Sequence, residues 1–91
     1  MTSKTDKPPI VPHVHLNGDS RQTLLDDFAA ATSALRKAID VVQKTAPNGR
    51  NFYNHPEGEG AMARATHEHL DRLRRLLAVN QELLTIAEEL L

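Results

Sequence analysis

Two long amphipathic stretches, separated by a helix-breaking segment, constrain this chain most. Apolar side chains recur every three to four residues between residues 20 and 45, and the same period returns between residues 61 and 91. This spacing places them on one face of an α-helix. Ala46, Pro47, Asn48 and Gly49 end the first stretch, because proline and glycine do not continue a helix. The sequence therefore predicts helices at about 20–45 and 61–91, joined by a loop at 46–60.

Both predicted helices carry a wide apolar stripe. In the first helix it consists of Leu24, Phe28, Ala31, Leu35, Ala38 and Val42, with Leu25, Ile39 and Val41 at its edge. In the second helix it consists of Ala63, Thr66, Leu70, Leu73, Leu77, Asn80, Leu84, Ala87 and Leu91, flanked by Leu76, Leu83, Ile86 and Leu90. Each stripe is wider than one partner helix covers, and a lone hairpin of this size buries too little surface to offset chain entropy. We expect an all-α, antiparallel helical hairpin that assembles into a homo-oligomer, in which Asn80 either sets the register or marks an exposed bend.

A different composition precedes the first helix. Residues 1–14 are polar and rich in proline, which favours extended chain, so they are predicted to form a flexible N-terminal leader before a helical domain at 15–91. Asn17 and Gly18 form a turn dipeptide, and either Asp19 or Ser20 is a strong helix N-cap.

Composition excludes several classes of protein. The chain has 91 residues, which suits one domain, and no cysteine, so it has no disulfide framework. Its net charge of −1 argues against binding to duplex nucleic acid. Residues 1–12 lack the apolar segment of a signal peptide, so we expect none, and no apolar run approaches the roughly 20 residues that a membrane span needs. We expect a soluble, cytoplasmic protein that does not bind membranes.

Histidine and serine residues provide weak signals for chemistry. The close histidine pairs are His13 with His15 and His67 with His69. The first pair shares a face of extended chain and could hold a metal weakly, whereas the second pair points about 200° apart around a helix. Ser20, His15 and Asp19 are the residue types of a catalytic triad, but no motif places them in one, and capping is the simpler role for Ser20. We predict no metal, no cofactor and no enzymatic activity.

Two features favour anion binding. The Asn17–Gly18 turn leads into a helix N-terminus whose first backbone N–H groups are unpaired, and Ser20 adds a hydroxyl; this geometry can hold a phosphate, although most such turns only cap a helix. The second helix carries a basic arc of Arg64, His67 or His69, Arg72, Arg74 and Arg75. Arginine binds phosphate or stacks on a base, but such an arc can also be a solvated charged face. Phe52 and Tyr53 either stack a base or close the hairpin.

Three segments give the chain a resemblance to a known family. They read HLNGDS at 15–20, PNGRNFY at 47–53 and ARAxHEHxxRL at 63–73. With them, nearly all of the chain from Val14 onward resembles the phage anti-CBASS cyclic-oligonucleotide sponges. These are helical proteins that form hexamers and sequester the signals of bacterial CBASS immunity without cleaving them. The resemblance therefore implies a phage-encoded protein that acts in the host cytoplasm.

The resemblance also implies a binding site where protomers meet. A cyclic trinucleotide would be held by Asn17, Gly18, Asp19, Ser20, Arg64, His69 and Arg72. The family turn usually has threonine or serine where this chain has Asp19, a carboxylate that would repel phosphate unless it faces away. The tyrosine and lysine of the family's separate dinucleotide pocket have no clear counterpart, since Leu16 and Ala31 stand there with only Ser33 nearby. Binding of cyclic dinucleotides is therefore less strongly implied than binding of cyclic trinucleotides.

The sequence thus favours a non-catalytic sponge for cyclic oligonucleotides. A structural or assembly accessory protein of a phage or prophage is the alternative, because wide apolar stripes need no ligand. A third possibility is an inhibitor that offers one helix face to a bacterial protein.

Overall fold

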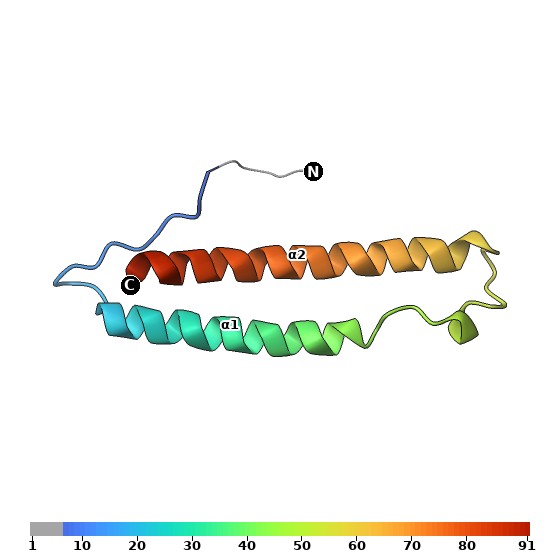
Figure 1. Ribbon diagram of the computed structural model, residues 1–91, viewed down its shortest axis with the longest axis horizontal. Helices are drawn as coiled ribbons and strands as arrows, with labels where there is room; N and C mark the ends of the chain where they lie inside the picture. Colours follow the sequence, from blue (N-terminus) through green and yellow to red (C-terminus); the bar gives the residue numbers. More distant parts are fainter. Residues whose placement is uncertain (1–6) are drawn as a thin grey trace.

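The chain folds into a long hairpin of two antiparallel α-helices (Figure 1). The structure, a computed structural model, describes residues 7–91. In this part of the chain α1 spans Arg21–Gln43, a short 3-10 helix (η1) spans Gly49–Asn51, and α2 spans Gly60–Leu90. No strand occurs among the described residues. The predicted all-α hairpin is confirmed for one chain.

Helix α1 begins where the sequence predicts a cap. The Ser20 side chain closes the first turn, because its Oγ accepts the backbone N–H of Thr23 at 3.1 Å. Before it, Gly18 donates its N–H to the carbonyl oxygen of His15 at 3.2 Å, which forms the predicted turn. Of the two candidate caps, Ser20 and not Asp19 accepts this bond. The helix ends at Gln43, four residues before the proline that cannot continue it.

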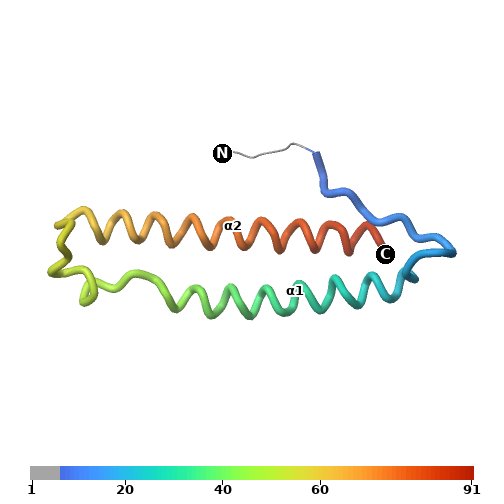
Figure 2. The backbone as a smooth tube through the Cα atoms, turned by 180° about the vertical axis from the view of Figure 1, so that it is seen from behind, coloured from blue at the N-terminus to red at the C-terminus, as the bar shows by residue number. Residues whose placement is uncertain are grey.

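The two helices differ in length, and the connecting segment fills the difference. α2 has 31 residues and α1 has 23, so α2 extends beyond α1 by about 12 Å at a rise of 1.5 Å per residue. The segment 44–59 runs beside this extension, and the end of α2 lies beside the start of α1 (Figures 1 and 2). The hairpin therefore has a loop end, with residues 44–59, and a terminal end, where α1 begins and α2 stops.

The face that α2 turns inward differs from the predicted stripe. The buried residues of α2 are Ala61, His69, Asn80 and Leu90, and those of α1 are Thr32 and Ile39. Residues at the centre of the predicted stripe lie outside: Leu70 and Leu77 are each 54% exposed, and Leu84 is 38% exposed. The other stripe residues are less exposed, since Asn80 is buried and Thr66, Leu73 and Ala87 are half-buried. The inward face of α2 therefore consists of this half of the predicted stripe together with its predicted flank. On α1 the prediction holds better: Ala31 and Ala38 are exposed, but the other four stripe residues are half-buried, namely Leu24, Phe28, Leu35 and Val42.

The segment before α1 has no regular secondary structure over residues 7–15. It turns at the terminal end and doubles back on the side of α2 (Figure 1). Pro9, Val11 and Val14 are half-buried, whereas Ile10 and Leu16 are fully exposed. Residues 1–6 of the predicted flexible leader lie outside the described residues.

The hairpin is elongated. Its principal extents are 62 × 26 × 17 Å and its radius of gyration is 18.5 Å, whereas a compact domain of this length has a radius of about 12 Å. Within residues 7–91, neither helix combines the length and the apolar character that a membrane span requires. The shape leaves most of each helix exposed along its sides.

Candidate functional site

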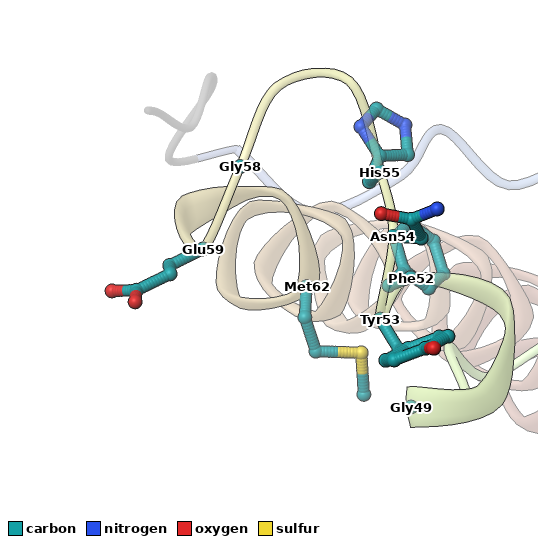
Figure 3. Close-up of a pocket in the computed structure, with 8 residues that line it drawn as sticks. All are labelled: Gly49, Phe52, Tyr53, Asn54, His55, Gly58, Glu59 and Met62. Carbon is teal, nitrogen blue, oxygen red and sulfur yellow. The ribbon is translucent and has the colours of Figure 1, made fainter.

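A hollow of about 490 Å³ lies at the loop end (Figure 3). It is lined by Gly49, Phe52, Tyr53, Asn54, His55, Gly58, Glu59 and Met62. Tyr53 is 89% exposed, so its ring offers a free aromatic face. Phe52 is half-buried and stacks on His55, with ring centroids 5.7 Å apart and an angle of 16° between the rings. The hollow can accept a flat, partly apolar group against these rings.

Local hydrogen bonds fix the loop that carries the aromatic residues. Asn48 caps η1, since its Oδ1 accepts the backbone N–H of Arg50 at 2.9 Å. Tyr53 donates its backbone N–H to the Gly49 carbonyl oxygen at 2.9 Å. The chain then reverses at Gly58, whose φ of 86° favours glycine. These short-range hydrogen bonds explain how residues 47–53 adopt a defined structure although they belong to neither long helix.

Arg64 lies in a second, smaller hollow that shares Phe52 and His55 with the first. This hollow measures about 130 Å³ and is lined by Phe52, His55, Glu57, Ala61, Arg64, Ala65 and Glu68. The Arg64 guanidinium pairs with two carboxylates, Nη1 to Glu57 at 3.1 Å and Nε to Glu68 at 3.3 Å. Its side chain remains 70% exposed, so both ion pairs are solvated. Replacing either carboxylate by another anion therefore costs little free energy. The loop end thus places a guanidinium beside an aromatic surface.

The remaining arginines of the predicted basic arc are also paired. Arg72 Nη2 lies 3.9 Å from Glu68 Oε1. Asp71 accepts two arginines, Arg75 Nε at 3.0 Å and Arg74 Nη1 at 3.7 Å. All three pairs are between residues three or four apart on α2, as expected for a helix surface. In one chain the arc has the character of a charged, solvated face.

His69 lies apart from Arg64 on α2. It is 5% exposed and faces into the hairpin, and its Nδ1 atom has no hydrogen-bond partner. His67 is exposed, so the two histidines point to different sides of the helix, as their spacing predicts. Of the site residues predicted on α2, the structure therefore leaves Arg64 and Arg72 on the surface and encloses His69.

The predicted phosphate turn lies at the terminal end, with residues 17–20 all exposed. A Cβ atom at Gly18 would stand 3.0 Å from the His15 ring, so the turn suits glycine. Ser20 Oγ accepts the Thr23 N–H and donates to Thr23 Oγ1 at 3.0 Å, which leaves it occupied by capping. The amides of Arg21 and Gln22 belong to the first turn, where no intrahelical acceptor exists, and they are the donors that remain for an anion.

The turn and Arg64 lie at opposite ends of the hairpin (Figure 1). Leu90 is level with the start of α1, and 26 residues of α2 separate it from Arg64, which corresponds to about 40 Å along the helix. One chain therefore does not bring the turn and Arg64 into one site. Any site that uses both takes them from two protomers.

The sequence pointed to Phe52 and Tyr53 as a possible base-stacking pair, but it did not predict the hollow around them. Met62, Asn54 and Gly58 complete the lining. No motif or regular spacing in the sequence marks these residues as neighbours, because a hollow between a loop and the start of a helix depends on how the loop folds. In the segment before α1, the ring centroids of His13 and His15, the pair that could hold a metal weakly, are 6.4 Å apart. Residues 7–91 contain no group of three or more histidine, aspartate or glutamate side chains placed to hold a metal ion.

Comparison of the chain with protein-family profiles, with curated protein sequences and with solved structures gave no significant match.

Proposed function

We propose that this chain is a non-catalytic, homo-oligomeric sponge for cyclic oligonucleotides. It binds and sequesters cyclic trinucleotides, with cyclic dinucleotides as the less strongly supported ligands, and does not cleave them. It thereby blocks CBASS defence in the cytoplasm of the bacterial host of a phage. The observation that carries the proposal is the loop end, where the exposed ring of Tyr53 and the guanidinium of Arg64 occupy adjoining hollows. A nucleotide needs these two partners, a flat surface for its base and a cation for its phosphate.

The ion pairs of Arg64 are compatible with this role. Glu57 and Glu68 hold the guanidinium in an exposed position, where each pair contributes little to stability. A phosphate can replace the Glu57 carboxylate because it presents the same kind of acceptor oxygens to the guanidinium. Glu57 then serves to keep Arg64 in place before a ligand arrives.

The test is isothermal titration with a panel of cyclic di- and trinucleotides, followed by chromatography of the released ligand. We expect binding of a cyclic trinucleotide with recovery of the intact molecule. Arg64→Ala should weaken binding about tenfold to a hundredfold, the usual effect of removing a charge-assisted phosphate contact. Tyr53→Ala should weaken it through loss of base stacking, whereas Tyr53→Phe, which keeps the ring, should not.

Arg36→Ala is the matched control. Arg36 is an exposed arginine in the middle of α1, on a polar side it shares with Ser33 and Asp40, far from the loop end. Its loss should leave the affinity unchanged. No binding across the panel, or equal losses for Arg64→Ala and Arg36→Ala, would contradict the proposal.

A second candidate is a helical assembly or accessory protein of a phage or prophage. The observation that favours it is the row of exposed leucines on α2, together with the ion pairing of the four α2 arginines, neither of which requires a ligand. Thermal unfolding separates the two functions. A sponge is stabilised by micromolar cyclic nucleotide through mass action, and an assembly protein is not.

A further inference from the structure

The exposed leucines of α2 form a regular row. Residues Ala63, Leu70, Leu77, Leu84 and Leu91 follow one another at intervals of seven and are all exposed. We name these five residues the leucine row. A seven-residue apolar repeat is the pattern by which one α-helix packs along another. Leu70 and Leu77, in the middle of the row, are each 54% exposed, so neither α1 nor any other part of residues 7–91 covers the leucine row.

The chain exposes more surface than a compact monomer of its mass, and the excess is large enough for an interface with a second copy. The accessible surface is 7240 Å², whereas a compact monomer of 10.1 kDa exposes about 5,300 Å². A stable interface buries about 800 Å² on each partner. Part of the excess belongs to the extended segment before α1, and the rest lies along the sides of the helices, enough for a second copy to cover.

The charges of α2 favour one orientation of that copy. The half of α2 before Leu76 carries four arginines, Arg64, Arg72, Arg74 and Arg75, against two acidic residues. The half after it carries three glutamates, Glu82, Glu88 and Glu89, and no lysine or arginine. Parallel pairing would set like charges side by side, whereas antiparallel pairing sets each basic half beside an acidic half. A 180° rotation about a two-fold axis therefore places the basic half of each α2 beside the acidic half of the other.

We propose that two copies of this chain pair antiparallel through the leucine row, about a two-fold axis near Leu77. The middle of the row then contacts itself, and Leu70 packs near the partner's Leu84. Such an interface is the same patch on both chains, as two-fold symmetry requires. The leucine row is the occupied side of an assembly and not a docking face for another protein.

This pairing also brings together the two halves of the predicted ligand site. With the axis near Leu77, Arg64 of one protomer lies level with the partner's Leu90, which is beside the start of the partner's α1 (Figure 1). The partner's Asn17–Ser20 turn then approaches the loop end that carries Arg64 and Tyr53. This composite site rests on the proposed function, whereas the pairing itself does not.

Disulfide trapping tests the pairing directly, because the chain has no cysteine of its own. Leu77→Cys should form a covalent dimer under mild oxidation. Chains with Leu70→Cys should cross-link to chains with Leu84→Cys when the two are mixed, and neither should cross-link to itself. The control is Ser33→Cys, on the polar side of α1, which should stay uncross-linked under the same conditions.

Each outcome bears on the proposal. Self cross-linking of Leu70→Cys would show parallel pairing, and equal cross-linking of Leu77→Cys and Ser33→Cys would show random collision; either result overturns the proposal. A Leu77→Cys chain that stays monomeric would leave the row to a different protein or surface and also overturns it. The readout involves no nucleotide. Trapped dimers that fail to bind any cyclic nucleotide would therefore contradict the proposed function and leave the pairing intact.

Discussion

The inner face of α2, which packs on α1, and its outer face, which carries the leucine row, differ in polarity in the reverse of the usual direction. The face packed on α1 and the loop encloses two polar residues, His69 and Asn80, each with a side-chain atom that lacks a hydrogen-bond partner. The opposite arrangement holds outside, where Leu70 and Leu77 are more than half exposed. Burying unpaired polar atoms while leaving leucines in water is unfavourable for a chain that acts alone. A second copy that covers the leucine row, as proposed above, would remove these leucines from water.

The largest expected effect is on self-association and comes from placing a charge in the leucine row. Leu77→Asp should abolish self-association, because it removes two leucines across a two-fold axis and buries two like charges. Because Leu77 is 54% exposed before pairing, loss of the two leucines alone costs about 2–3 kcal/mol per dimer. Size-exclusion chromatography with light scattering measures the change.

Ala29→Asp is the control for this substitution. Ala29 lies on α1 beside Ser33 and Arg36, where it is exposed on a polar side. We expect this variant to assemble like the parent chain. If Leu77→Asp also assembles like the parent, the outer face of α2 is not the interface.

A smaller effect is expected on the inner face. Asn80→Leu removes a buried Oδ1 atom without a partner, so it should raise the free energy of unfolding by about 1–2 kcal/mol. Urea unfolding measures it as a higher midpoint at an unchanged slope. Gln43→Leu, at an exposed position on α1, should change the midpoint little. A lower midpoint for Asn80→Leu would show that the amide finds a partner in the assembly.

The smallest of these effects concerns the terminal end. Ser20→Ala removes the N-cap of α1 and should cost about 1 kcal/mol, whereas Ser20→Asp, which still accepts the Thr23 N–H, should cost much less. Ser33→Ala, in the exposed middle of α1, is the matched control and should be neutral. The measurement is again the urea midpoint. Equal destabilisation by Ser20→Ala and Ser20→Asp would contradict capping as the role of Ser20.

The helices were predictable from the sequence because their signals are local. Ser20 has the hydroxyl that caps a helix, and Pro47 has the ring that prevents its continuation. The inward face of α2 was not predictable in the same way. The apolar residues of that helix span a wide arc, and periodicity does not tell which part of the arc packs on α1 and which part stays exposed. The placement of Asn80 and His69 inside, with Leu77 outside, depends on how the two helices pack.

The candidate site was predictable only in its parts. The Asn17–Gly18 turn and Arg64 stand out by residue type, whereas their separation of about 40 Å follows from the antiparallel packing of the two helices. The hollow beside Tyr53 depends on the fold of residues 48–58, where short hydrogen bonds and the reversal at Gly58 set the backbone. Local chemistry is thus visible in the sequence, whereas the distance between chemical groups comes from the fold.

Sedimentation equilibrium of the unmodified chain tests the central claim, that a second copy covers the outer face of α2. We expect an even-numbered species, a dimer or a hexamer built from dimers, that persists down to micromolar concentration. A single species at the monomer mass of 10.1 kDa across that range would contradict it.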